Sequence, residues 1–195
     1  MKQLKKIIIV IPFFILSCAS GQYLKSYEPI NAFLETQKID KNKKYILQAD
    51  KENNTQPLRI FNGSEGSKHI IDSTDPEDYT GGLFVEKYWK EIYSEYAKDT
   101  LKRYWNKEDF PEYNFILEKG TGLILKQDFL VKYLDSKIDE LFIFSEPMYY
   151  MDKKYIIFSY EKRNFEGSGS PKVVIMKKEN QKWVVVRILS DYIYN

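Results

Sequence analysis

The sequence has few of the residues that most often carry chemistry. Its 195 residues include one cysteine, Cys18, and one histidine, His69. A single thiol cannot close an intramolecular disulfide, and a structural or catalytic zinc site needs more nitrogen or sulfur ligands than these two side chains provide. We therefore expect no metal and no cofactor, and a fold whose stability comes from its apolar core.

The chain also lacks an excess of charge of one sign. It carries 30 Lys and Arg against 28 Asp and Glu, and three of the lysines fall within the first six residues. Without those three, 27 basic residues stand against 28 acidic ones. A near-neutral chain has no basic patch of the kind that binds nucleic acid, so we expect no nucleic-acid partner.

Long apolar runs are missing as well, apart from a short one at the start. Ile7 to Leu16 is apolar and follows Lys2, Lys5 and Lys6. Ten helical residues extend about 15 Å, half of the ~30 Å hydrocarbon core of a bilayer. A positive segment followed by a short apolar run is typical of a secretory signal peptide and not of a spanning helix.

The apolar run ends in Ile15-Leu16-Ser17-Cys18, which resembles the lipobox of bacterial lipoproteins. In that family the thiol receives a diacylglyceryl group, the chain is cut before the cysteine, and the new amino terminus is acylated. The resemblance implies a signal peptide over residues 1–17 and lipidation of Cys18 with palmitate-type chains. The alternative is an ordinary secretory signal that happens to contain a cysteine.

The segment after Cys18 indicates how the protein is placed. Residues 18–28 begin with small, uncharged side chains, as expected of a tether leading away from a membrane. Ala19 differs from the aspartate that retains lipoproteins in the inner membrane, so the resemblance favours the outer membrane of the bacterial envelope. Residues 29–195 suit one domain.

The last third of the chain predicts an antiparallel sheet. Turn-forming residues separate four runs rich in β-branched and aromatic residues: 141–144, 155–160, 173–176 and 183–189. The last two runs are apolar on both alternating faces, which is typical of strands covered on both sides. Residues 84–103 carry an amphipathic helical pattern that would cover one face. We expect an α+β fold in which this helix packs on an antiparallel C-terminal meander.

The remaining segments give shorter signals. Helices are predicted over 30–38 and within 127–139, and a polar loop rich in glycine covers 62–82. Strands are predicted over 45–47, 58–61, 113–117 and 122–125.

The C-terminal part also resembles uncharacterised small lipoproteins of Bacteroidota. The residues that carry this likeness are Phe144-Ser145-x-Pro147, Tyr155 to Tyr160, and Val173 to Lys178 leading to Lys182 to Val185. They cover about a quarter of the chain. The resemblance implies no known activity.

The 62–82 loop holds the polar residues best suited to catalysis. His69 lies near Asp72 and Asp75, and Glu77 and Asp78 follow. A histidine oriented by a carboxylate is a general base, and a carboxylate cluster is a calcium ligand set. The histidine lacks a nucleophile partner and the spacing does not match an EF-hand, so we expect a solvated loop and no catalytic residue.

Aromatic residues of the predicted sheet are the best candidates for binding. Tyr149, Tyr155, Tyr160 and Trp183 would form a platform for a sugar or a peptide if they shared one exposed face. The alternative is that they pack in the core.

Two functions follow from these observations. The first is a membrane-anchored envelope lipoprotein that binds or assembles with a protein or glycan partner without catalysis. The second is a hydrolase of cell wall or glycan that uses carboxylates of the 62–82 loop or near Glu140 and Glu146. A hydrolase requires two carboxylates about 5–10 Å apart in a cleft. We favour the first because the sequence contains no catalytic constellation.

Overall fold

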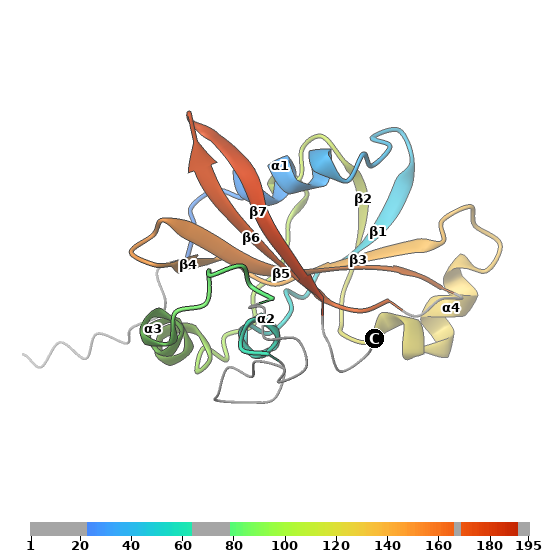
Figure 1. Cartoon of the computed structure of the whole chain (residues 1–195). Helices are drawn as coiled ribbons and strands as arrows, with labels where there is room; N and C mark the ends of the chain where they lie inside the picture. Colours follow the sequence, from blue (N-terminus) through green and yellow to red (C-terminus); the bar gives the residue numbers. More distant parts are fainter. Residues whose placement is uncertain (1–22, 64–78, 166–168, 191–195) are drawn as a thin grey trace, which may run out of the picture.

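The computed structural model describes residues 23–63, 79–165 and 169–190. Within them, four α-helices and two 3-10 helices surround one seven-stranded sheet (Figure 1). The strands are β1 (Lys44–Gln48), β2 (Asn114–Glu118), β3 (Glu140–Phe144), β4 (Met148–Tyr150), β5 (Tyr155–Asn164), β6 (Lys172–Glu179) and β7 (Lys182–Ser190). The helices are α1 (Glu28–Thr36), α2 (Thr55–Phe61), α3 (Glu86–Tyr96), η1 (Lys107–Asp109), η2 (Leu123–Leu125) and α4 (Gln127–Tyr133).

The sheet has an antiparallel half and a parallel half. Its strand order is β2-β1-β3-β5-β6-β7, and β4 pairs with β5 beside this path. β5, β6 and β7 form the antiparallel meander, which confirms the predicted α+β fold. β1 runs parallel to both β2 and β3. The sequence does not predict this parallel half, which depends on the long helical connections between these strands.

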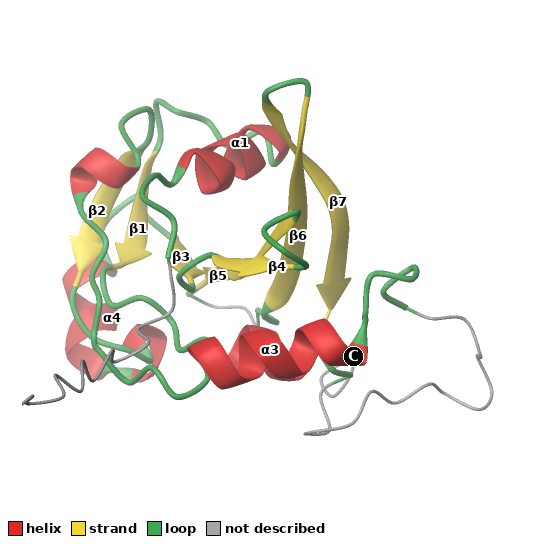
Figure 2. Cartoon of the chain, turned by 90° about the vertical axis from the view of Figure 1, so that its left-hand side faces the viewer, coloured by secondary structure: helices red, strands yellow, loops and turns green. Residues whose placement is uncertain are grey.

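One face of the sheet is covered by α1. Pro29 occupies the first turn, where no backbone N–H is needed, and the buried stripe Ile30, Phe33 and Leu34 faces the strands. The Phe33 ring lies 5.7 Å from that of Phe158 in β5. Figure 2 shows α1 lying between the β1–β2 side and the β6–β7 side of the bent sheet. The predicted helix over 30–38 is confirmed, with its last turn ending at Thr36.

The opposite face is covered by α2 and α3. The apolar stripe of α3, Trp89, Ile92 and Tyr96, is buried against β4, β5 and β6, so its role as a cover is as predicted. The helix is shorter than the predicted 84–103, because the next positions of the stripe are polar. Asp99 then accepts a hydrogen bond from the backbone N–H of Leu101 at 3.0 Å, which forms a turn and directs the chain away.

Two predicted strands are helices. Residues 58–61 belong to α2, since a four-residue apolar run carries no period that separates a strand from a buried helix. Pro57 lies in the first turn of that helix. Residues 122–125 form η2, which begins after Gly122 at φ +60°. Glycine adopts this left-handed backbone without strain, and the conformation interrupts an extended chain.

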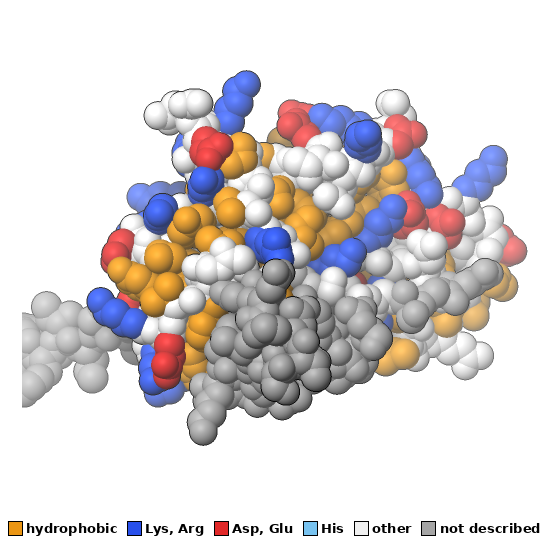
Figure 3. All heavy atoms as spheres, viewed as in Figure 1, with side chains coloured by type: hydrophobic (Ala, Val, Ile, Leu, Met, Phe, Trp, Pro, Cys, Tyr) orange, Lys and Arg blue, Asp and Glu red, His pale blue; other side chains and the backbone are white. Residues whose placement is uncertain are grey.

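Only one of the two strands predicted to be covered on both sides is fully covered. Val173 to Met176 in β6 are completely buried. β7 is the last strand of the sheet, so its side chains Trp183 to Val186 are partly exposed and Ile188 is exposed. Figure 3 shows hydrophobic side chains gathered along this part of the surface, with lysines and arginines between them.

The β6–β7 turn leads to a first testable prediction. Asn180 and Gln181 have φ of 47° and 66°, as in a two-residue turn that favours Asn-Gly. Gln181→Gly is expected to raise the free energy of unfolding by about 0.5–1 kcal/mol, because glycine removes the left-handed strain. Gln37→Gly is the control. Gln37 has φ −81°, so glycine relieves no left-handed strain there and no gain in stability is expected. Urea unfolding that shows a loss for Gln181→Gly would contradict this.

Candidate functional site

A cleft of about 460 Å³ opens at the carboxyl ends of the three parallel strands. The loops that follow β1, β2 and β3 meet there, because neighbouring parallel strands end at the same edge of a sheet. The segment after α3 and Tyr23 complete the wall. We call this the strand-end cleft; its lining residues are Tyr23, Asp50–Asn54, Asp99–Arg103, Gly120, Thr121, Lys126 and Glu146.

A buried ion pair forms part of the wall of the strand-end cleft. Lys51 Nζ lies 2.6 Å from Glu146 Oε2, and the two side chains are 6% and 4% exposed. The Tyr27 hydroxyl donates to the other carboxylate oxygen of Glu146 at 2.8 Å and accepts from Lys51 Nζ at 2.5 Å. The three groups therefore satisfy one another and fix the loops after β1 and β3 to the segment before α1.

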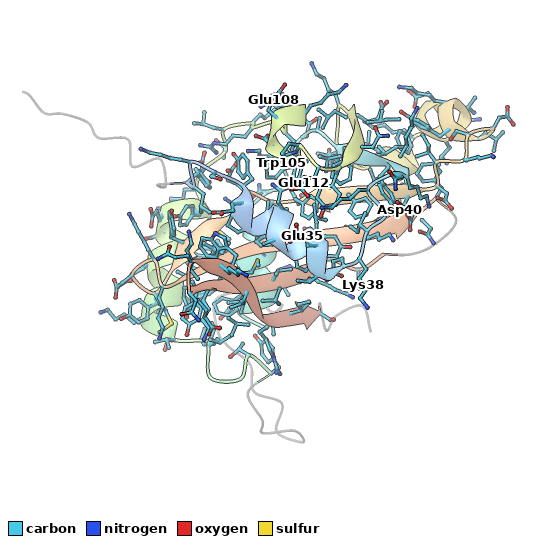
Figure 4. The ribbon with its side chains drawn as sticks, turned by 90° about the horizontal axis from the view of Figure 1, so that it is seen from above. Glu35, Lys38, Asp40, Trp105, Glu108 and Glu112 are labelled. Carbon is cyan, nitrogen blue, oxygen red and sulfur yellow. The ribbon has the colours of Figure 1, made fainter. Side chains whose placement is uncertain are left out.

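Two aromatic rings enclose the same ammonium. Lys51 Nζ lies 4.3 Å from the centre of the Tyr27 ring and 4.0 Å from that of Trp105. Figure 4 shows Trp105 between α1 and the turn that carries Glu108. Burial lowers the pKa of Lys51, while the hydrogen bond to Glu146 opposes that shift. The Lys51 ammonium is therefore held by groups within the domain.

A second network holds the opposite wall of the strand-end cleft. The Tyr23 hydroxyl donates to Asp99 at 2.9 Å and accepts from Asn54 Nδ2 at 2.8 Å. Arg103 pairs with Asp99 at 2.7 Å and stacks over the Tyr23 ring at 4.3 Å. Burial and the bond to Asp99 raise the pKa of Tyr23, so its hydroxyl remains a donor at neutral pH.

Three polar groups of the strand-end cleft are left without partners in the described part of the chain. Lys102 and Lys126 are exposed and form no ion pair there. Lys126 Nζ lies over Gly120, where an added Cβ would approach it to 2.7 Å. Asn54 Oδ1 is buried and accepts no hydrogen bond. Leu101 adds an exposed apolar side chain. The carboxylates of Asp50 and Glu52 line the same cleft, so the site offers both charges and hydrogen-bonding groups to a partner.

The described residues hold no group of three or more His, Cys, Asp or Glu side chains placed to bind a metal ion. Nor does any helix in this part of the chain have the length and apolarity needed to cross a membrane. The two charge pairs of the strand-end cleft are mutually neutralised.

A second groove of about 360 Å³ lies on the other side of Tyr23. We call it the N-terminal groove; its lining residues are Tyr23–Ser26, Glu28, Pro29, Tyr149, Lys153 and Trp183. Two of the four predicted binding residues, Tyr149 and Trp183, meet here, both partly exposed. The Trp183 indole N–H donates to Glu28 at 3.2 Å.

The other two predicted binding residues lie apart from this groove. Tyr155 is buried on the α2–α3 side of the sheet, and Tyr160 is buried on the α1 side against Phe33 at 4.8 Å. The two lie five residues apart on β5, an odd spacing that points side chains to opposite faces. The four aromatics therefore do not share one surface.

Of the predicted catalytic candidates, the structure describes Glu140 and Glu146. His69 and the acidic residues from Asp72 to Asp78 lie outside the described residues, as does Cys18. Glu140 pairs with Lys43 and Lys162 at the start of β3. Glu146 follows the end of that strand, about 13 Å or more away at ~3.3 Å per residue.

Four other carboxylates lie on the outer surface. Figure 4 shows Glu35, Asp40, Glu108 and Glu112 around α1 and the turns beside it. All four are exposed. They do not line the strand-end cleft.

The sequence gives almost no sign of the strand-end cleft. Lys51 and Glu146 come together because β1 pairs in parallel with β3. No local sequence pattern shows this pairing. Tyr23, Leu24 and Tyr27 fall in the expected tether 18–28, yet all three pack against the domain. The large apolar side chains of these three residues are the one sequence signal that this segment packs against the domain.

Comparisons with protein-family models, with curated proteins and with solved structures find no significant match to this chain.

Proposed function

We propose that this protein is a lipid-anchored module of the bacterial envelope that binds a partner in the strand-end cleft without catalysing a reaction. Cys18 carries the acyl chains, and the outer membrane is the expected location. The partner is an envelope protein or a glycan that presents an anionic group to Lys102 and Lys126. The observation that carries the proposal is the pair of unpartnered lysines, Lys102 and Lys126, on a cleft with an internally satisfied wall.

The wall favours binding because it is already ordered. Lys51 is fixed by Glu146 and Tyr27, and Arg103 is fixed by Asp99 and the Tyr23 ring. A partner that enters does not have to order these side chains, so less conformational entropy is lost on binding. The rim lysines then supply charge complementarity, which speeds association and selects the partner.

The hydrolase alternative has less support. The loop carboxylates that it would use, from Asp72 to Asp78, lie outside the described residues. Its other two, Glu140 and Glu146, are both ion-paired and lie near opposite ends of β3. A glycosidase pair has to flank one bond. The polar surface of the strand-end cleft is better suited to holding a partner than to cleaving it.

The test is capture of the partner from detergent-solubilised envelope. The acylated wild type and a Lys102→Glu/Lys126→Glu variant serve as bait, with bound protein identified by mass spectrometry and bound glycan by an array. Reversing two rim charges is expected to lower recovery about tenfold or more, which corresponds to about 1.4 kcal/mol. Lys38→Glu/Lys137→Glu is the matched control, since both lysines are exposed outside the strand-end cleft.

A partner recovered equally by all three baits would place binding elsewhere on the molecule. No partner from either source, with wild-type bait folded and acylated, would overturn the proposed function.

A further inference from the structure

The point at which the chain enters the domain lies close to the expected anchor. Five peptide steps separate Cys18 from Tyr23, and at ~3.6 Å per residue they span at most about 18 Å. Tyr23 is itself fixed to the domain, with its ring 5.2 Å from that of Tyr96 in α3 and its hydroxyl bonded to Asp99. If Cys18 is held at a bilayer, the surface around Tyr23 therefore lies within reach of the headgroups.

The N-terminal groove occupies that surface. Figure 2 shows this side of the molecule face-on, with α1 above, β4 in the middle and α3 below. The groove is bounded by Tyr149 of β4 and Trp183 at the start of β7, with Leu24 buried at its base. Segments far apart in the sequence thus bring two amphipathic aromatics to the place where the chain enters.

Lysines surround these aromatics. Lys25 is exposed and forms no ion pair within the described residues. Lys153 lies 5.3 Å from the centre of the Tyr149 ring, and Lys178 lies 5.6 Å from that of Trp183. Glu28 is the carboxylate that lines the groove, and it is bonded to Trp183 and close to Lys178. The groove therefore has an excess of positive charge.

Partly exposed Trp and Tyr beside lysine is the composition of a membrane–water interface. Their rings prefer the headgroup level, where one end is apolar and the other is hydrated. Lysines near the surface are attracted to anionic lipids. The short link to Cys18 would hold these groups at that level.

We infer that the N-terminal groove rests on the bilayer that holds Cys18 and receives its phospholipid headgroups. This inference deepens the proposed function and rests on the lipid anchor. It gives the domain a fixed orientation, in which Tyr149 and Trp183 contact lipid. The strand-end cleft, which shares Tyr23 with the groove, then opens close to the membrane surface.

The tryptophans make this contact measurable. The protein has three, of which Trp89 and Trp105 are 3% and 2% exposed, so Trp183 is the one at the surface. The acylated full chain is reconstituted in vesicles of phosphatidylethanolamine and phosphatidylglycerol, with or without lipids brominated near the headgroup. Brominated lipid is expected to quench roughly a third of the emission, the share of one tryptophan in three.

Trp183→Phe is expected to abolish the quenching, and Lys25→Glu/Lys153→Glu is expected to reduce it. Lys38→Glu/Lys137→Glu, which makes the same charge change away from the groove, should leave it unchanged. An acylated wild type whose emission is not quenched would overturn the inference while the anchor stands, and so would quenching that persists in Trp183→Phe. A chain without acyl groups would instead overturn the proposed function on which the inference rests.

Discussion

Replacing Cys18 with alanine is expected to release the protein from membranes and to abolish incorporation of labelled palmitate. Cys18 is the one thiol of the chain, and it follows directly after the apolar run. Buried methylenes contribute ~0.8 kcal/mol each, so one long acyl chain contributes on the order of 10 kcal/mol. With several chains missing, the variant should move from the washed membrane pellet to the soluble fraction.

Ser17→Ala is the matched control for this experiment. It keeps a small residue before the cysteine and leaves the thiol in place, so labelling and membrane retention should match those of the wild type. A Cys18→Ala protein that still sediments with salt-washed membranes, or that still carries the label, would contradict the lipid anchor.

Replacing Glu146 with glutamine is expected to lower the free energy of unfolding by about 3–5 kcal/mol, because Lys51 is left charged and buried without its counter-ion. For a chain of this size the melting temperature should fall by roughly 6–20 °C. Urea unfolding of the purified protein measures the loss. Glu112→Gln is the control: it breaks an ion pair with Lys41 in which the two side chains are 57% and 44% exposed, so little change is expected.

The pH dependence separates a stranded charge from a general packing defect. Burial already lowers the pKa of Lys51, and removing Glu146 lowers it further. As the pH rises through that folded-state pKa toward 10.5, Lys51 loses its proton in the folded protein before it does so in the unfolded chain. The unfolded state then binds more protons, so the stability of Glu146→Gln should rise with pH relative to the wild type.

A double replacement tests the same explanation independently. Lys51→Met/Glu146→Leu removes both charges and is expected to recover most of the lost stability. A Glu146→Gln variant that loses no more stability than Glu112→Gln would show that the buried pair does not hold the loops together.

The sequence predicts the parts of this fold that rest on a repeating local pattern. The stripe Trp89, Ile92 and Tyr96 recurs at helical spacing, and the runs in β5 and β6 are rich in β-branched and aromatic residues, which favours strands over helices. Residues 58–61 are too few to show a period, so the sequence predicts a strand where the structure has α2.

The candidate site is less predictable because it depends on contacts between distant residues. Lys51 and Glu146 are 95 positions apart and meet only because β1 and β3 lie side by side in parallel. Tyr149 and Trp183 could be named as candidates because exposed aromatics are recognisable by type. Tyr155 and Tyr160 lie away from them because successive side chains of a strand point to opposite faces of the sheet. A platform that joins all four residues ignores this alternation.

The most direct measurement is the intact mass of the protein extracted from membranes, together with the mass of its N-terminal peptide. We expect a chain that begins at Cys18 and carries a diacylglyceryl thioether and an amide-linked acyl group. A chain that retains Met1, or that begins unmodified at any other residue, would contradict the anchor and the membrane orientation inferred from it.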